Sequence, residues 1–335
     1  MPTYTAADAD LAIIKTKRIV VIGYGNQGEA HALNLRDSGV ADVVIGAREG
    51  SASGEKARAA GFPVTSNAEA VRDADVVVLG APDEKLPEIY ARDLASNMKR
   101  GAALLFIHGF ALHFGFIQPR EDLDVIMVAP AGPGNALRAN YLSGDGYIGL
   151  IAIHRDASGN ARPLALSYGA AIGVGMIETT FREETETDLF GEQTVLCGGA
   201  GELARAAFDT LVNAGYAPEL AYFECLHQLK LLVDLMHTRG PAGMYKAISN
   251  TAEYGAYRTG PRVIDADARE QMKAVLADVQ SGKFAREWMA ENASGLKEFT
   301  TMRERAAAHP IEAVGRRLRA MMPWLSRKDG AKEKS

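Results

Sequence analysis

The chain has 335 residues, of which 47% are hydrophobic and 24% charged, and its formal net charge is −5. This composition is that of an ordinary globular protein and excludes wholesale disorder. The mild negative charge gives the chain no general attraction for nucleic acid or anionic membranes. No apolar run reaches the ~18 residues of a transmembrane helix. The length suits two domains of ~100–200 residues better than one.

The cysteines and the N-terminal segment both indicate a cytoplasmic protein. Cys197 and Cys225 form no disulfide framework, and the sequence has no C-x-x-C. The N-terminal segment is acidic and its only apolar run is residues 11–14, which is too short for a secretory signal peptide. We therefore expect the chain to work in a reducing compartment.

The first half of the chain alternates short apolar runs with stretches of helical pattern. The runs are almost continuously apolar, which is typical of strands covered on both faces, as in a parallel sheet. This repetition predicts a doubly wound α/β sheet. The predicted strands are residues 18–23, 42–47, 75–80, 102–108, 124–129 and 147–153, and the predicted helices between them are 29–38, 54–60 and 84–98.

The second half has a different character, because no long β-branched run recurs after Thr180. We predict a boundary near residue 182, which separates an α/β domain (1–182) from an all-α domain (183–325). The polar segment 326–335 is predicted to be a disordered tail. The predicted helices of the second domain are residues 183–197, 200–214, 219–237, 266–280 and 311–322.

A glycine-rich turn follows the first predicted strand directly. Residues 23–28, Gly23-Tyr24-Gly25-Asn26-Gln27-Gly28, form a G-x-G-x-x-G that ends a buried strand and opens a helix. In this context the glycines permit a tight turn and close backbone approach, so that a pyrophosphate can lie at the helix N-terminus. The alternative is a glycine turn that binds nothing.

The end of the second strand predicts which dinucleotide binds. An enzyme that uses NAD places Asp or Glu there to hold the ribose 2′-OH. This chain has Ala47-Arg48, with Ser51 and Ser53 close behind. An arginine and two hydroxyls suit a 2′-phosphate, so the sequence favours NADPH. The alternative is a solvated surface arginine beside loop serines.

Two helices of the second half carry acidic or amide side chains one turn apart. Asp188 and Glu192 have i, i+4 spacing, and so do Glu224 and Gln228. Glu224 is flanked by apolar residues, and a carboxylate in such a setting needs a cation or hydrogen bonds. Asp188, Glu192 and Glu224 together could hold Mg²⁺. The alternative is a solvated acidic face, shared with Glu183, Glu184 and Glu186, plus one capping acid.

Ser249 lies in a polar stretch, AISNTAEYG, within an otherwise helical region. From the residues alone we interpret it as the N-cap of the turn that follows.

Long stretches of the chain resemble the short-form ketol-acid reductoisomerases of branched-chain amino-acid biosynthesis. The similarity runs from about residue 17 to residue 324. Its carriers are GYGNQGEAHALNLRDSG, HGFALHFG, DVIMVAPAGPG, ETTFREETETDLFGEQTVLCGG, AGYAPELAYFECLHQLKLLVDL and ISNTAEYG followed by GPRVI.

The resemblance implies a Rossmann domain followed by a helical, knotted domain, in a homodimer whose active sites are shared between subunits. It also implies NADPH, two Mg²⁺ ions, and an alkyl migration followed by hydride reduction of the resulting 3-hydroxy-2-keto acid. His108 matches the active-site histidine, Ser249 a substrate contact, and Asp188 the ligand that bridges the two ions. The other matched positions are Glu192 and Glu224 for metal, with Gln228 at a further ligand position, and, for the cofactor, residues 23–28, Arg48, Ser51, Ser53, Asp83 and Gly134.

Two departures from the family pattern fall in the expected reaction centre. The family's P-K-G-P-G is here Pro130-Ala131-Gly132-Pro133-Gly134, and its E-C-L-H-E-L-K has Gln228 in place of the second Glu. Together these changes remove one positive and one negative charge, which leaves the local balance unchanged. We hypothesise a re-tuned site with a changed substrate and a weakened or absent migration step. Smaller departures are Asn26 for serine, Glu29 for histidine, Leu86 for glutamine, Ala111 for asparagine and Asn135 for histidine.

Three alternatives stand beside this hypothesis. The chain could be an ordinary ketol-acid reductoisomerase that tolerates both substitutions, or a reductase of a 2-keto acid or an imine in a specialised pathway. A non-enzymatic NADP-binding scaffold is the third, although a scaffold has no physical need for buried carboxylates.

Overall fold

The computed structural model describes residues 1–324, so the predicted tail of residues 326–335 lies outside the described residues. The chain divides into two compact units, and the division falls between Asp188 and Leu189. That position lies within helix α9 (Phe181–Gly191) and after the boundary predicted near residue 182.

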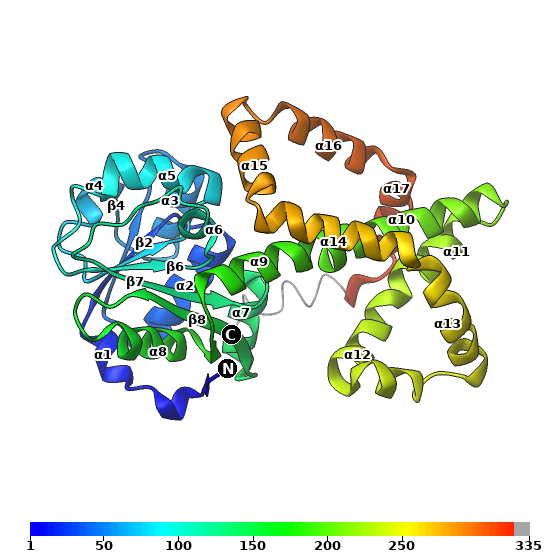
Figure 1. Ribbon diagram of the computed structural model, residues 1–335, viewed down its shortest axis with the longest axis horizontal. Coiled ribbons are helices and arrows are strands. Elements are labelled where there is room, and N and C mark those ends of the chain that lie inside the picture. The colour runs from blue at the N-terminus through cyan, green and yellow to red at the C-terminus, as the bar shows by residue number, and fades with distance from the viewer. Residues whose placement is uncertain (325–335) are drawn as a thin grey trace. The chain divides into compact units, whose positions relative to one another are not determined.

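The first unit is built on a mixed sheet (Figure 1). Within residues 1–324, nine strands form one sheet in the order β1-β9-β8-β7-β6-β5-β2-β3-β4. Strands β2 to β7 are parallel, whereas β8 is antiparallel to β7 and β1 is antiparallel to β9. The bounds are β1 Thr3–Tyr4, β2 Arg18–Ile22, β3 Asp42–Gly46, β4 Val64–Thr65, β5 Val76–Leu79, β6 Ala103–Phe106, β7 Asp124–Pro130, β8 Tyr147–Arg155 and β9 Val174–Glu178.

The predicted doubly wound α/β sheet is confirmed, and each of the six predicted strands forms. Strand β8 runs antiparallel to β7, so the sheet is not purely parallel. An apolar run looks the same in either direction when both of its faces are covered, so the pattern carries no information on direction. Strands β1, β4 and β9 were not predicted, because β1 and β4 have two residues each and β9 contains a glycine.

Helices cover both faces of the sheet and complete two hydrophobic cores (Figure 1). Each fully buried aliphatic side chain in these cores contributes about 1.5–3 kcal/mol to folding. One face is covered by α1 Leu11–Lys15, α2 Asn26–Asp37, α3 Ala52–Ala59, α7 Gly134–Ser143 and α8 Ala161–Ile172. The other is covered by α4 Asn67–Ala70, α5 Leu86–Ile89, the π-helical turn η3 Tyr90–Leu94 and α6 Phe110–His113. Short 3₁₀ turns are η1 Ala6–Asp8 and η2 Asp83–Lys85, so the helix predicted over 84–98 is divided into three pieces.

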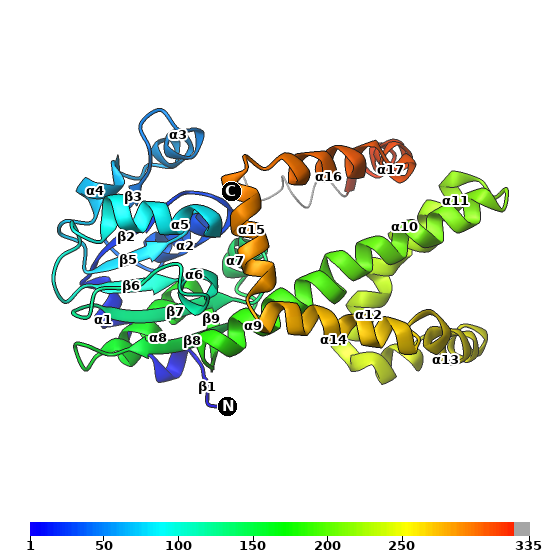
Figure 2. The same ribbon diagram turned by 45° about the horizontal axis from the view of Figure 1, so that its top comes forward.

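The second unit is helical throughout residues 189–324, as predicted. Its bounds are η4 Glu192–Leu196, α10 Gly198–Asn213, α11 Pro218–Tyr222, η5 Phe223–His227, α12 Gln228–Tyr245, α13 Asn250–Val263, α14 Ala266–Gln280, α15 Lys283–Ala293, α16 Lys297–Ala308 and α17 Pro310–Ala320. In Figure 2, α16 runs apart from α14 along its length.

The second unit has a small core for its length. Its core cluster consists of Phe208, Ala221, Tyr222, Ile311, Leu318 and Met322, drawn from α10, α11 and the α17 region. Elsewhere large apolar side chains are exposed in the single chain, among them Leu196 at 69% and Tyr254 at 64%. Within the described part of the chain, every helix is too short or too polar to cross a lipid bilayer.

Candidate active site

A pocket of about 780 Å³ lies at the carboxyl ends of the parallel strands of the first unit. It is lined where β2, β3, β5 and β6 end, by Gly23, Gly46, Gly80 and His108 among others. The sheet order reverses between β2 and its neighbour β5, and ligands of open α/β sheets bind at such a position. The pocket therefore lies where a doubly wound sheet binds a dinucleotide.

The glycine turn has the close packing that its sequence predicts. Gly23 has φ +89°, and a Cβ there would lie 3.0 Å from the backbone nitrogen of Ala81. A Cβ on Gly28 would lie 2.4 Å from the carbonyl oxygen of Gly23. Helix α2 begins directly after Gly25, which offers no side-chain cap. Its first N–H groups are therefore available to an anion.

The three side chains inside the turn are already engaged by protein. Tyr24 is 2% exposed and its ring packs against Phe62 at 5.8 Å between centroids; burial raises its pKa to about 12. Asn26 accepts a hydrogen bond from the N–H of Asn135 in α7, and Gln27 donates one to the carbonyl oxygen of Gly132 in the loop that follows β7. Contact of residues 23–28 with a cofactor remains a prediction. In this structure the groups that could make such a contact are the backbone N–H groups of the turn.

The predicted cofactor-selecting residues lie together on the same pocket. Arg48 is exposed just after β3, and Ser51 and Ser53 line the pocket beside it. The Ser51 hydroxyl donates to the carbonyl oxygen of Arg48 at 2.7 Å and accepts from the Gly54 N–H at 3.3 Å, which makes it the N-cap of α3. The loop is thus ordered by its own hydrogen bonds.

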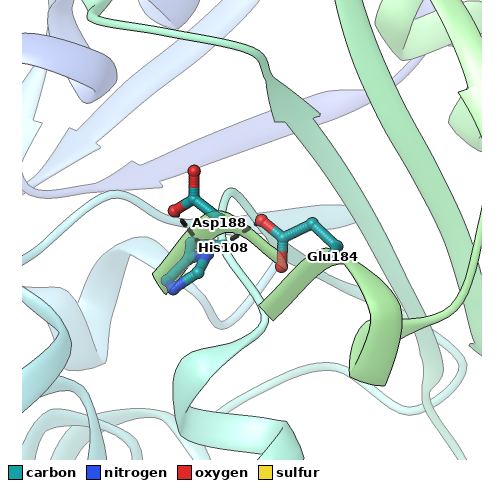
Figure 3. A group of neighbouring side chains, drawn as sticks. All are labelled: His108, Glu184 and Asp188. Carbon is teal, nitrogen blue, oxygen red and sulfur yellow. Dashed lines mark hydrogen bonds and ion pairs between the residues drawn. The ribbon is translucent and has the colours of Figure 1, made fainter. Parts of the chain in front are cut away.

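His108, Glu184 and Asp188 form a cluster at the edge of this pocket (Figure 3). His108 follows β6, and the two acids lie one turn apart on α9. His108 Nδ1 is 2.8 Å from Glu184 Oε1 and 3.7 Å from Asp188 Oδ2. The second Glu184 oxygen accepts from the Gly109 N–H at 2.9 Å and from the Thr185 hydroxyl at 3.2 Å. The side chain of Glu184 is 4% exposed, whereas that of Asp188 is 54% exposed.

Burial and neighbouring charges shift the pKa values of His108 and of the two aspartates near it. Burial alone would lower the pKa of His108, but the hydrogen bond and negative charge of Glu184, with the charges of Asp83 and Asp188, raise it to about 9. Burial, which is opposed by the charge of His108 and assisted by the charges of Glu84, Glu184 and Asp188, raises the pKa of Asp83 to about 6. Burial, with the charge of Glu184, also raises the pKa of Asp188.

Glu184 is the site residue that sequence reasoning missed. The sequence interpretation placed it on a possible solvated acidic face with Glu183 and Glu186. For Glu184 and Glu186 that interpretation is wrong, because both side chains are largely buried, that of Glu186 being 12% exposed. A usable signal was present, because Glu184, Asp188 and Glu192 follow one another at i, i+4 and i+8 and so share one helical face.

The remaining predicted ligands lie in the second unit. Glu192 begins the π-helical turn η4. Glu224 lies in the π-helical turn η5, and Gln228 is the first residue of the helix α12 that follows it. Turns of this kind are frequent at functional sites. The predicted apolar setting of Glu224 is not observed, because its side chain is exposed in the single chain. Sequence neighbours in a helix point about 100° away, so flanking apolar residues do not bury it.

Ser249 is the N-cap of α13, as its sequence predicts. Its hydroxyl accepts from the Ala252 N–H at 3.2 Å. Its contact with a substrate remains a prediction.

Comparisons with known proteins identify the family. Residues 13–177 match the acetohydroxy acid isomeroreductase NADPH-binding domain, and residues 181–324 match the ketol-acid reductoisomerase C-terminal domain. The chain belongs to the ketol-acid reductoisomerase family. A solved structure of an NADH-preferring ketol-acid reductoisomerase from an uncultured archean is 45% identical, covers 96% of this chain and 99% of its own, and has a TM-score of 0.93.

More distant structures share the fold alone. A semialdehyde dehydrogenase NAD-binding protein from Cupriavidus necator is 20% identical, with a TM-score of 0.60 over 79% of this chain and 99% of its own. A pyrroline-5-carboxylate reductase from Coxiella burnetii is 15% identical, with a TM-score of 0.55 over 79% of this chain and 97% of its own.

As a ketol-acid reductoisomerase family member, the chain is an NAD(P)-dependent oxidoreductase that acts on small keto acids.

Proposed function

We propose that this protein is an NADPH- and Mg²⁺-dependent reductase of a small 2-keto or ketol acid, in which alkyl migration is weakened or lost. The observation that carries the proposal is the cluster of His108, Glu184 and Asp188 at the edge of the dinucleotide pocket. Hydride transfer needs a polarised carbonyl and a hydrogen-bond donor beside the nicotinamide. His108 is a hydrogen-bond donor of that kind, and Asp188 could hold a cation that would polarise the carbonyl.

The residues that line the pocket after β3 support NADPH. They are Gly46, Ala47, Arg48, Ser51 and Ser53, and none of them is acidic. A guanidinium beside hydroxyls favours a 2′-phosphate. The 45% identical relative is described as NADH-preferring, so the ratio of kcat/KM for the two cofactors is the decisive measurement. We expect NADPH to be preferred.

The donor set fits a hard divalent cation. Glu184 is committed to His108 and Gly109, whereas the carboxylate of Asp188 is half exposed and Glu192 follows one turn later on the same helical stretch. Oxygen ligands of this kind suit Mg²⁺. We propose that Asp188 and Glu192 hold Mg²⁺ together with Glu224 and Gln228, and that Ser249 contacts the substrate carboxylate.

The chain's own groups orient and protonate the substrate. When bound, NADPH supplies the hydride and Mg²⁺ a Lewis acid. Glu184 holds His108 by Nδ1, which leaves Nε2 as the ring nitrogen that can meet a substrate oxygen. The Gly109 N–H and the Thr185 hydroxyl fix the Glu184 carboxylate in turn. This second layer of hydrogen bonds restricts the imidazole to one orientation.

Alkyl migration demands more of the site than reduction does. It requires that the substrate hydroxyl lose its proton while the receiving carbonyl is polarised. Ala131 and Gln228 provide neither the positive charge nor the carboxylate that the family has at these positions. Purified protein with NADPH and Mg²⁺ should therefore oxidise NADPH faster with 3-hydroxy-3-methyl-2-ketobutyrate than with 2-acetolactate. Equally fast oxidation with both substrates would show an ordinary ketol-acid reductoisomerase.

We also propose a homodimer with shared sites, in which the second unit has the family's knotted form. The support is the small core of that unit and the exposed apolar side chains on several of its helices, including Leu231, Tyr257 and Met302. Apolar surface of this extent marks a protein interface. Light scattering of the purified protein should give twice the chain mass of 35.8 kDa or a multiple of it, and a monomer would contradict the proposal.

A further inference from the structure

Helix α7 lacks a cap from its own strand–helix loop. Its N-cap residue is Pro133, whose side chain cannot accept a hydrogen bond. The N–H of Asn135, one of the first N–H groups of the helix, is satisfied instead by Asn26 Oδ1 at 2.8 Å. Asn26 lies 109 residues earlier in the sequence, at the first position of α2. Because Asn135 offers an N–H, the atom of Asn26 that faces it must be the oxygen.

A second hydrogen bond holds the same loop. Gln27 Nε2 donates to the carbonyl oxygen of Gly132 at 2.8 Å. The backbones are also in direct contact, since a Cβ on Gly134 would lie 2.2 Å from the carbonyl oxygen of Asn26. On the far side of the loop, a Cβ on Gly132 would lie 2.5 Å from the Tyr147 hydroxyl. The loop of residues 131–134 is therefore held between the nucleotide turn and β8.

We infer that Asn26 is a positioning residue that caps α7 from another element and, with Gln27, locks the 131–134 loop onto the nucleotide turn. The side chain of Asn26 then acts on the loop and not on the cofactor phosphates. The loop follows β7, which pairs in parallel with β6, and β6 leads to His108. The lock thus ties the glycine turn after β2 to the end of β7, the strand that pairs with the one leading to His108.

This inference separates two roles for Asn26 that a sequence motif cannot distinguish. In the capping role, the oxygen matters and the amide nitrogen does not, so Asp should replace Asn. In a phosphate-binding role, the amide N–H matters, and both Ala and Asp should fail in the same way. Asn26→Ala should therefore fail in either role, and Asn26→Asp is the variant that distinguishes them.

The first readout is hydrogen exchange of the Asn135 amide in the protein without cofactor. We expect Asn26→Ala to lose protection there and to melt ~2–4 °C lower, as the loss of a cap requires. Asn26→Asp should keep both properties. Asn135→Ala is the matched control, because it retains the backbone N–H that Asn26 caps. This readout needs no substrate, so it stays decisive if the proposed substrate class is wrong.

The second readout is steady-state kinetics with NADPH and the rearranged 2-keto acid, and it rests on the proposed function. Asn26→Ala should lower kcat about tenfold at saturating NADPH, because the 131–134 loop loses its fixed position on the glycine turn. Asn26→Asp should restore kcat while raising KM for NADPH, since its negative charge would repel a pyrophosphate bound at the glycine turn. The inference is overturned if both variants keep the wild-type protection at Asn135 and raise only KM.

Discussion

Glu184 Oε1 lies 2.8 Å from His108 Nδ1, and the two residues are 76 positions apart in the sequence. The other oxygen of Glu184 accepts the N–H of Gly109, the residue after His108. One nearly inaccessible carboxylate thus holds both the side chain and the following backbone of the candidate catalytic histidine. The arrangement fixes the imidazole against rotation and provides a direct test of the site.

Replacing Glu184 by Gln should lower kcat by at least ~10²-fold while KM for NADPH stays near the wild-type value. The amide keeps an oxygen for Gly109 but loses the charge that pairs with His108, so the imidazole is held less firmly. Steady-state kinetics with both parameters resolved provides the measurement. Glu183→Gln is the matched control, because the exposed carboxylate of Glu183 accepts hydrogen bonds from the nearby hydroxyls of Thr179 and Thr180. Equal losses in both variants would remove Glu184 from the site.

Mg²⁺ should raise the melting temperature of the wild-type protein, and Asp188→Asn should abolish most of that rise. A ligand that binds only the folded state stabilises it by mass action, and the half-exposed Asp188 carboxylate is the proposed anchor. A thermal melt at increasing Mg²⁺, without substrate, measures the effect. Asp73→Asn, at an exposed position far along the chain, should behave as wild type. An unchanged Mg²⁺ response in Asp188→Asn would refute the proposed metal site.

Arg48→Asp should reverse the cofactor preference. The carboxylate would repel a 2′-phosphate and could accept from a ribose 2′-OH, so KM for NADPH should rise ~10-fold or more while KM for NADH stays level or falls. Kinetics with both cofactors measures the ratio. Arg72→Asp changes the same charge at another exposed position and tests for a non-specific effect. If the two variants shift the ratio alike, Arg48 does not select the cofactor.

His31 should make the first unit sensitive to acid. It is wholly buried on α2, its Nδ1 lies 2.8 Å from the Tyr168 hydroxyl, and burial lowers its pKa to about 3. The unfolded chain takes up this proton below its ordinary value of 6.5, whereas the folded chain does not. The stability is therefore complete above pH 6.5 and falls by roughly 1.4 kcal/mol per pH unit below it, until the folded pKa is reached.

Urea unfolding between pH 4 and pH 8 measures this dependence. His31→Gln should show a flatter pH profile than wild type, even if its stability at pH 8 is lower. His237→Gln, at an exposed histidine of the second unit, should keep the wild-type slope. A slope that persists unchanged in His31→Gln would show that other groups control the acid sensitivity.

Features that depend on residues close together along the chain could be predicted from the amino-acid sequence. Apolar runs such as the one in β5 are typical of strands covered on both faces, and the spacing from Gly23 to Gly28, directly after such a strand, is typical of a tight turn. The N-cap role of Ser249 was equally local, because its partner Ala252 is three residues away. In each case the physical cause lies within one element and its caps.

Which of several chemically equivalent side chains enters the site depends on packing between distant parts of the chain. Glu183 and Glu184 are adjacent and chemically alike, yet long-range packing leaves one exposed and places the other on His108. In the same way, no local pattern connects Asn26 to the N-terminus of α7, and no apolar run records that β8 is antiparallel to β7. Periodicity gives the face of an element, but the identity of what covers that face depends on contacts between residues distant in sequence.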